Sequence, residues 1–413
     1  MLARMAATTD LRDAAGVLAE VLALARPLPA SELSLADAVG LVLAEDVASP
    51  VPLPGFDNAA MDGFAVRAGD LSGASDPAPV HLRIVGTSVA GEPCRATIGE
   101  GSALRIATGA PIPAGADAVV RLEDADVPEP DEALFRAAVV PGTNVRRTGE
   151  DVAAGDVLLA SGTVVGPGQV AAAAAGGLAR VPAHRRPRVT VIVTGDEVVA
   201  AGSAVGEAHV TDAIGPALSA LLADAGCVPS LLGPIPDDAG DAAHALIDAA
   251  RGADVVVTTG GISMGPRDHV RAALVSAGAN VVSVAIRPGK PFAFGRRGES
   301  LLFGLPGNPV SALVAFEVFV RPALSALMGR PAGERPRVTA RLAEPFSQRP
   351  GRLHVVRARL DRSSPGARVT VLAQQGAGSL GSLGRANAWM VVGPDVERLD
   401  EGAEVETWPM LPG

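Results

Sequence analysis

The chain has 413 residues, 48% of them hydrophobic and 19% charged, with 48 glycines, 34 prolines and no tyrosine. This composition is typical of a globular protein of about two to four domains and argues against a disordered chain. The formal net charge of -10 argues against binding to nucleic acid or to an anionic membrane surface, because either polyanion would be repelled.

The first 30 residues contain an apolar stretch that Asp13 and Glu20 interrupt, so we interpret it as an amphipathic helix rather than a signal peptide. No uninterrupted run approaches the roughly 18 apolar residues that span a bilayer. Cys94 and Cys227 lie alone, without the spacing of a disulfide framework or a metal site. We therefore expect a cytoplasmic protein without a membrane partner.

Residues 50–140 have the first distinct pattern. Short β-type runs at 81–86 and 118–122 alternate with turns rich in Gly, Pro and Asp, which predicts a small β-rich domain. The segments on either side, 1–49 and 141–182, have helical or extended patterns and are expected to pack together. The β-rich domain is then an insertion into a helical and extended linker domain.

Near-continuous apolar strands alternate with helices in residues 183–330. Such strands are typical of a parallel sheet covered on both faces, so we predict a three-layer αβα domain. The predicted strands are 189–193, 228–233, 254–258 and 280–285, and the predicted helices are 214–225, 239–251, 267–277 and 309–328. Residues 331–413 return to short strands, which predict a small β-barrel or sandwich; these strands are 337–342, 353–360, 367–372 and 389–392.

Two polar, glycine-rich loops follow strands of the predicted parallel sheet. Residues 194–197 (TGDE) follow the first strand, and residues 258–265 (TTGGISMG) follow the third. Ligands bind at the carboxyl ends of such strands, and glycines allow backbone N–H groups to surround an anion. A single Gly-Gly pair is more often only a tight turn. Two such loops, together with residues 304–309 (GLPGNP) opening the last helix, favour phosphate binding.

Acidic side chains accompany these loops: Asp196, Glu197, Asp212, Asp237, Asp238 and Asp268. Each one alone is more often a helix cap or a solvated turn residue, and Asp237 and Asp238 directly precede a predicted helix. Since successive strand ends converge in space, we expect several of these acids to lie near one another. Carboxylates beside a phosphate site suit Mg²⁺, which keeps water and phosphate as its other ligands.

Lys290 is the only lysine in the chain, so every other residue in the Lys and Arg total is arginine. It follows a predicted strand, within residues 288–295 (PGKPFAFG), and is expected at the same edge of the sheet. A lysine supplies a compact point charge for a phosphate or an oxyanion, without the planar fork of arginine. A GC-rich codon bias can leave one lysine by chance, but a position beside a glycine and between two prolines favours a function.

An ordered set of motifs runs through the chain: residues 57–67 (DNAAMDGFAVR), 108–120 (TGAPIPAGADAVV), 149–151 (GED), 194–197, 260–265 (GGISMG), 288–295 and 304–312 (GLPGNPVSA). The set resembles that of the MoeA-type molybdopterin molybdenumtransferases, which include the gephyrin E domain. The resemblance implies insertion of molybdenum from molybdate into adenylylated molybdopterin, with Mg²⁺ present and AMP released. It also implies a MogA-like αβα domain, a C-terminal β-barrel and a homodimer in which the β-rich domain completes the other subunit's cleft.

The same resemblance implies roles for individual residues. Glu197, Asp237 and Asp268 are the expected catalytic and metal-binding acids, and Asp62 is a further catalytic residue from the second subunit. Substrate contacts are expected from Thr108, Asp212, Gly260, Gly261, Ser263, Arg287, Lys290, Arg357 and Ser382. Arg287 and Lys290 match two lysines of the molybdate pocket, and Arg357 matches a basic residue near the oxyanion. The linker domain is expected to carry dimer contacts, and a MogA-type adenylyltransferase is a candidate partner.

Residues 211–214 (TDAI) depart from the family pattern, which has an aromatic residue, Asp, Ser or Thr, and Asn at this helix start. Only Asp212 is kept, and each lost hydrogen bond to a charged ligand is worth ~1.5–3 kcal/mol. The loop near Ser382 has also lost a serine at Gly381. Ala213 and Ile214 favour the alternative of a non-catalytic molybdopterin-binding or scaffold paralogue, whereas the intact Glu197, Asp237, Asp268 and Lys290 favour an enzyme. An ordinary nucleotide-binding enzyme ranks last, because the chain has neither a GxGxxG fingerprint nor a Walker lysine.

Overall fold

The computed structural model describes residues 11–92, 94–262, 269–330, 336–363 and 366–410. These residues form two compact units. Unit 1 contains the described parts of Met1–Ser31, Gly40–Val42 and His184–Gly413, and unit 2 contains those of Glu32–Val39 and Leu43–Ala183.

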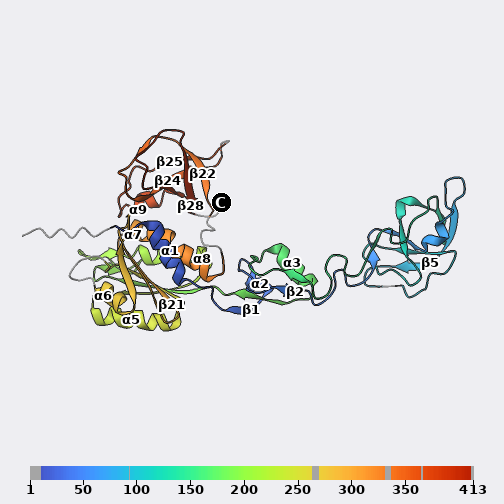
Figure 1. Ribbon diagram of the computed structural model, residues 1–413, viewed down its shortest axis with the longest axis horizontal. Coiled ribbons are helices and arrows are strands. Elements are labelled where there is room, and N and C mark those ends of the chain that lie inside the picture. The colour runs from blue at the N-terminus through green and yellow to red at the C-terminus, as the bar shows by residue number, and fades with distance from the viewer. Residues whose placement is uncertain (1–10, 93, 263–268, 331–335, 364–365, 411–413) are drawn as a thin grey trace, which may run out of the picture. The chain divides into compact units, whose positions relative to one another are not determined.

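A six-stranded sheet forms the centre of unit 1 (Figure 1). Its strands, in spatial order, are β16 (Val228–Ile235), β13 (Arg188–Thr194), β17 (Val255–Thr259), β21 (Ser300–Leu305), β20 (Pro291–Arg297) and β18 (Ala279–Ser283). The first four run parallel, as the apolar runs predict, whereas β20 is antiparallel to both of its neighbours. The sheet is therefore mixed rather than wholly parallel.

Strands β20 and β21 form a hairpin that the sequence analysis did not predict. Its turn contains Gly298, which has a φ of +58°, and Arg297 pairs with Ser300 across it. Because the hairpin is antiparallel, the start of β20 and the end of β21 lie at the same edge of the sheet. The hairpin thus brings the turn that carries Lys290 next to the loop that opens α7, which begins at Pro309.

Helices cover both faces of the sheet (Figure 1). Those that share a core cluster with Val191 of β13 are α4 (Ile214–Asp224), α7 (Pro309–Ala315) and α8 (Arg321–Leu327). Those that share a core cluster with Ile192 are α5 (Ala239–Gly252) and α6 (His269–Ser276). Adjacent residues of one strand enter different cores because successive side chains point to opposite faces, which produces three layers.

Helix α1 (Ala14–Leu24) also belongs to unit 1. The Asp13 carboxylate accepts a hydrogen bond from the Gly16 N–H (2.8 Å) and caps the helix. Val17 and Val21 are buried in the core cluster that contains residues of α4 and α8. We expected this helix within a linker domain at 1–49, but it packs with the sheet instead. The other predicted domain boundaries stay predictions.

The last helix of the sheet domain contains a π-helical turn, η3 (Phe316–Val320), between α7 and α8. Pro322 lies in the first turn of α8, and because proline has no N–H it interrupts the regular hydrogen-bond ladder. Among the described residues, Pro309–Leu327 is the one helix long and apolar enough to cross a membrane, but 78% of its apolar window is buried inside the protein. It packs as a core helix.

The carboxyl-terminal part of unit 1 is a closed five-stranded β-barrel. Its strands, in order around the barrel, are β24 (Leu353–Asp361), β25 (Arg368–Val371), β22 (Val338–Leu342), β28 (Glu404–Pro409) and β26 (Ala388–Val392). The closing contact is the antiparallel pairing of β24 with β26. A two-residue strand, β19 (Ile286–Arg287), leaves the sheet domain and pairs with the start of β24, so that Arg287 lies beside His354.

Unit 2 contains a second six-stranded sheet. Its strands, in spatial order, are β7 (Ala118–Arg121), β4 (Gly63–Val66), β6 (Ser102–Ile106), β5 (Val80–Ser88), β9 (Glu132–Phe135) and β8 (Ala125–Glu129). A smaller core joins α2 (Leu35–Ala38), α3 (Pro167–Ala175) and the paired strands β2 (Val47–Ala48) and β11 (Val157–Leu159). The predicted fold class is confirmed: a multidomain α/β protein with an αβα domain, a β-rich insertion, a helical and extended linker region and a C-terminal barrel.

The remaining short elements are β1 (Ala30–Ser34), β3 (Asn58–Ala59), η1 (Ala68–Leu71), η2 (Leu122–Asp124), β10 (Val145–Arg146), β12 (Arg180–His184), β14 (Val198–Val199), β15 (Val210–Thr211), β23 (Phe346–Ser347), α9 (Leu380–Leu383) and β27 (Arg398–Leu399).

Candidate active site

A polar pocket of about 700 Å³ lies where the parallel strands of unit 1 end. It is bounded by the loops that follow β13, β16, β17 and β21, by the turn between β19 and β20, and by two residues of the barrel domain. Its lining includes Gly195, Glu197, Asp237, Gly260, Gly261, Arg287, Gly289, Lys290, Gly307, Asn308, Ser311, Arg352 and Ala377. The predicted convergence of strand-end loops is thus present.

Glycines bring the backbone to the pocket surface. Gly260 and Gly261 have φ values of +88° and +60°, a left-handed conformation that side-chain-bearing residues rarely adopt. A Cβ atom on Gly261 would lie 2.7 Å from Cγ2 of Val270, so the loop packs too closely on α6 for any larger residue. Ser263, which we predicted to follow in the same loop, lies outside the described residues.

Two of the predicted catalytic acids, Glu197 and Asp237, line the pocket together. The Asp237 N–H donates to Oδ1 of Asp196 (3.0 Å), which holds the loop after β16 against the loop after β13. Burial, together with the charges of Asp196 and Glu197, raises the pKa of Asp237. A third carboxylate, Asp268, was predicted here but lies outside the described residues.

Asp238 and Asp212 serve as caps. Asp238 accepts hydrogen bonds from the N–H groups of Gly240 (2.7 Å) and Asp241 (3.1 Å) at the start of α5. Asp212 is buried and accepts from the first amides of α4, those of Ile214 and Gly215, at 2.9 Å each. Although we predicted a substrate contact for Asp212, its carboxylate is used by the helix and it is not among the pocket-lining residues.

Three cationic side chains line the same pocket: Lys290, Arg287 and Arg352. The first two come from the turn between β19 and β20, and Gly289 in that turn would place a Cβ atom only 3.2 Å from Cβ of Ser311 on α7. Arg352 comes from the barrel domain, just before β24. Sequence reasoning missed Arg352, because only the pairing of β19 with β24 brings this residue to the sheet edge.

Arg357 and Ser382 do not line the pocket. Arg357 is almost fully buried, with 1% of its surface exposed, and Ser382 is fully buried. Both side chains are hydrogen-bonded to backbone carbonyls of residues 374–379 in the barrel domain. The structure therefore places them behind the pocket wall.

Asp62 and Thr108 lie together in unit 2. Oδ1 of Asp62 accepts hydrogen bonds from the Thr108 N–H (2.6 Å) and hydroxyl (2.8 Å), and the backbone bond, followed by the hydroxyl bond, lowers the pKa of Asp62. Asp62 is therefore an ionised carboxylate held by one partner residue. The prediction that this pair completes the cleft of a second subunit stays a prediction.

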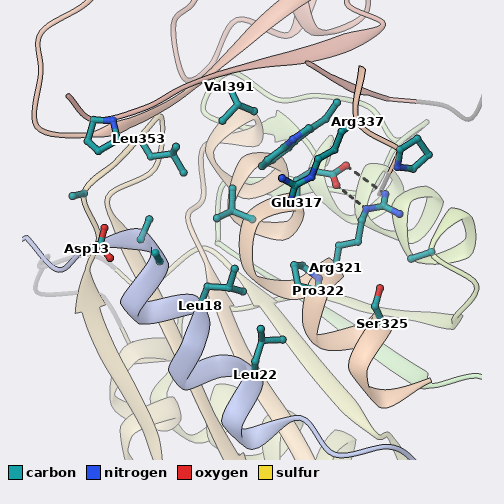
Figure 2. A pocket seen from close by; sticks show the side chains of 18 of the residues that line it. Asp13, Leu18, Leu22, Glu317, Arg321, Pro322, Ser325, Arg337, Leu353 and Val391 are labelled. Atoms are coloured by element: carbon teal, nitrogen blue, oxygen red, sulfur yellow. Dashed lines mark hydrogen bonds and ion pairs between the residues drawn. The ribbon is translucent and has the colours of Figure 1, made fainter. Parts of the chain in front are cut away.

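A second cavity of unit 1 is larger, about 850 Å³, but different in character (Figure 2). It lies between α1, α8 and the barrel, and its walls include Leu18, Leu22 and Leu353. It contains acids and arginines, among them Arg321 paired with both Glu317 (2.7 Å) and Asp224 (3.1 Å). Of the two cavities, only the smaller one is lined by the glycine loops that follow the strands, so the smaller polar pocket is the candidate active site.

The polar pocket was also predicted to hold Mg²⁺. Among the residues that the structure describes, no group of three or more His, Cys, Asp or Glu side chains could hold a metal ion. Glu197 and Asp237 nevertheless supply two carboxylates in one pocket, and Mg²⁺ is usually bound by one or two carboxylates together with substrate phosphates and water. This donor set fits Mg²⁺ that arrives with a phosphorylated substrate.

Comparison with known families divides the chain into three matched regions. Residues 11–177 match the MoeA N-terminal region (domains I and II), residues 190–326 match a probable molybdopterin binding domain, and residues 339–410 match the MoeA C-terminal region (domain IV). The order of the three regions is the one that the motif resemblance implied.

Individual relatives agree with this division. Molybdopterin molybdenumtransferase 2 of Mycobacterium tuberculosis is 38% identical over 401 residues, which cover 95% of this chain and 98% of the relative. The molybdopterin molybdenumtransferase of Haemophilus influenzae is 39% identical over 75% of this chain. A crystal structure of the molybdopterin biosynthesis MoeA protein from Pyrococcus horikoshii has a TM-score of 0.80 and 30% identity, and covers 97% of this chain and 100% of that one. The chain therefore belongs to the family of the MoeA-type molybdopterin molybdenumtransferases.

Proposed function

We propose that the protein inserts molybdenum from molybdate into adenylylated molybdopterin and releases AMP, as a step of molybdenum cofactor biosynthesis. The observation that carries this proposal is the single pocket that combines two acids, three cations and glycine loops. The relatives that cover most of the chain bear the name molybdopterin molybdenumtransferase.

The glycine loops are proposed to bind the phosphates of the substrate. Gly260 and Gly261 leave the backbone accessible, and Gly307 and Asn308 precede the N-terminus of α7. Backbone N–H groups and a helix N-terminus favour anions there, because both present partial positive charge. Gly307 lies against this loop, since a Cβ atom on it would be 3.4 Å from Cα of Gly260.

Glu197 and Asp237 are proposed to hold Mg²⁺ against the pyrophosphate linkage, with Asp268 as a third candidate. Bound there, Mg²⁺ would polarise the linkage as a Lewis acid and orient water for its hydrolysis. The two carboxylates are not proposed as nucleophiles towards molybdate, which is itself an anion. Asp196 would position Asp237 through the hydrogen bond to its N–H.

The cations are proposed to bind molybdate. Lys290, Arg287 and Arg352 face one pocket, and together they offset the two negative charges of the oxyanion. Lys290 would act as a point charge, whereas the arginines would offer planar forks.

We further propose a homodimer in which Asp62 and Thr108 of one subunit complete the cleft of the other, as the family resemblance implies. A cytoplasmic location, where both free cysteines stay reduced, and substrate delivery by a MogA-type adenylyltransferase belong to the same proposal.

The deciding test uses the purified full chain with adenylylated molybdopterin, molybdate and Mg²⁺, and measures AMP release. We expect release that requires all three components. Bound pterin without AMP above the protein-free control would instead support the alternative, a non-catalytic molybdopterin-binding or scaffold paralogue. This alternative is supported by residues 211–214 (TDAI), which lack the aromatic, hydroxyl and amide side chains at the positions where the family pattern has them.

A further inference from the structure

A loop of the barrel domain forms one wall of the polar pocket. This wall loop, residues 374–379, lies between β25 and α9 and contributes Ala377 to the pocket lining. It contains two glycines, Gly376 and Gly378, and glycine-rich segments lose more conformational freedom on ordering than other segments. Its position therefore has to be fixed by contacts between loop residues and the rest of the protein.

One contact attaches the wall loop to the sheet domain. The Val310 N–H donates to the carbonyl of Ala377 (3.1 Å). Val310 is in the first turn of α7, where backbone N–H groups have no partner within the helix. The bond joins the wall loop to the same helix start that supplies Asn308 and Ser311 to the pocket.

Ser382 donates to the carbonyls of Gln374 (2.7 Å) and Ser379 (2.9 Å) at the two ends of the loop, and its middle is held by Arg357 and Gln375. The Arg357 guanidinium donates to the carbonyls of Gly376 (3.0 Å) and Ser379 (3.1 Å), on either side of Ala377. The Gln375 side chain accepts from the Arg357 N–H (3.1 Å) and donates to the carbonyls of Arg357 (2.9 Å) and Leu372 (2.7 Å). Gln375 thus binds the loop to β24 through both ends of its amide.

Arg357 carries its charge among neutral oxygens. Within the described part of the chain its hydrogen-bond acceptors are one amide oxygen and two carbonyls, and no carboxylate forms an ion pair with it. A buried cation without a counter-charge costs free energy, and a well-formed set of hydrogen bonds is what makes it tolerable. Lysine could not reproduce this set, because the ammonium lacks the planar fork that reaches both carbonyls.

We propose that Arg357 and Gln375 are positioning residues that fix the wall loop as one side of the oxyanion pocket, without touching the substrate themselves. This inference rests on the proposed function, since molybdate is taken as the oxyanion. It assigns Arg357 an indirect role in place of the direct contact expected from the sequence. It also adds Gln375, which neither the motifs nor the family resemblance singled out.

The test compares full-length variants in the AMP-release assay at varied molybdate. In Gln375→Ala we expect the half-saturating molybdate concentration to rise about tenfold, because a small displacement of a binding wall is costly. The half-saturating concentration of adenylylated molybdopterin should stay near the wild-type value. Arg357→Lys and Arg357→Met should resemble each other, since the fork rather than the charge holds the loop.

Asn387→Ala is the matched control. Asn387 also joins two backbone groups of the barrel, accepting from the Leu360 N–H (2.7 Å) and donating to the Leu360 carbonyl (2.9 Å), but it lines neither cavity. Its molybdate dependence should match wild type. Hydrogen exchange of the Val310 amide should accelerate in Gln375→Ala and not in Asn387→Ala.

Three outcomes separate the possibilities. Gln375→Ala with wild-type molybdate dependence, or Arg357→Lys with wild-type behaviour, overturns the positioning role. A wild-type chain that releases no AMP contradicts the proposed function instead, and calorimetric titration of the same variants with molybdate alone then decides whether the wall loop shapes an oxyanion site. Should Arg357→Met fail to fold, Gln375→Ala alone decides.

Discussion

The two cavities of unit 1 show that size and chemistry are separate properties. The larger one, of about 850 Å³, lies between the sides of α1 and α8 and the barrel, and its walls are largely apolar (Figure 2). The smaller one, of about 700 Å³, lies at strand ends, where glycine loops and a helix start expose backbone N–H groups. Helix sides present side chains chosen for packing, whereas strand ends present backbone polarity, and only the second suits a polyanionic substrate.

The largest expected effect concerns stability in the apolar cavity. Glu317 is almost fully buried and pairs with Arg321 (2.7 Å), so Glu317→Ala leaves this buried cation with Asp224 (3.1 Å) as its other carboxylate partner. We expect a loss of about 3 kcal/mol in the free energy of unfolding, the low end of the range for a broken buried pair because Asp224 stays, measured by urea denaturation. AMP release per folded molecule should be unchanged. A specific loss of activity would show that the two cavities are not functionally separate.

The control for that variant is Asp248→Ala on α5. Asp248 pairs with Arg251 (2.8 Å), but both side chains are largely exposed, at 69% and 76%. Exposed pairs contribute about 0–1 kcal/mol, so this variant should unfold close to wild type.

The next effect concerns Lys290 in the polar pocket. If a small tetrahedral oxyanion requires a compact charge, Lys290→Arg should lower kcat/KM for molybdate nearly as much as Lys290→Ala, by about 100-fold. The molybdate dependence of AMP release in the three proteins provides the measurement. An arginine variant that behaves like wild type would mean that any cation serves at this position and that codon bias left one lysine there by chance.

Neighbouring acids provide a matched pair of variants. Asp237→Asn should abolish Mg²⁺-dependent AMP release at a cost below ~1 kcal/mol in stability, because Asp237 lines the pocket and caps no helix. Asp238→Ala should do the reverse, losing about 1 kcal/mol because it caps α5, with activity kept. Thermal melts and the AMP assay on both variants distinguish the roles. Equal losses of stability in the two variants would mean that both acids cap α5.

Arg352 should have a smaller effect than Lys290. It lines the pocket from the barrel side, and removing one hydrogen bond to a charged ligand should raise the half-saturating molybdate concentration about tenfold. Arg349→Ala is the control, because Arg349 is exposed in the same connection and does not line the pocket. If both variants act alike, the effect is long-range charge rather than contact.

The last prediction concerns pH. Burial, with the nearby charge of Arg287, lowers the pKa of His354 from 6.5 to about 4. The folded-state value lies below the unfolded one, so protonation favours the unfolded chain. Stability should therefore fall as the pH decreases from 6.5 towards 4. Urea denaturation at several pH values should show a weaker acid dependence in His354→Asn, and an identical dependence would contradict this account.

Local patterns in the sequence predicted the parts of the fold that local physics controls. The apolar runs of β13 and β17 and the glycine loops after them are short-range signals, and all lie where expected. The β20–β21 hairpin was missed because its strands overlap residues 288–295 and 304–312. We interpreted these two motifs as binding loops and did not test them for strand patterns.

The candidate site was predictable only in part, because its finer assignments depend on contacts between distant segments. Asp237 and Asp238 are indistinguishable by type, and only the backbone at the start of α5 decides which one caps it. Arg352 reaches the pocket from the barrel side, whereas Arg357, which has the same charge and belongs to the same motif, is buried and bonds to the backbone of the wall loop. No periodicity in the sequence encodes that difference.

The two-residue pairing of β19 with β24 has an evolutionary consequence. It fastens one end of the Lys290 turn to the barrel, while β20 fastens the other end to the sheet. A gene fragment that encoded the sheet domain alone would keep the glycine loops, Glu197, Asp237 and Lys290 but would leave this turn attached at one end. Substitutions that displace the barrel relative to the sheet would also displace Lys290. We therefore expect the two domains to be inherited, duplicated and lost together.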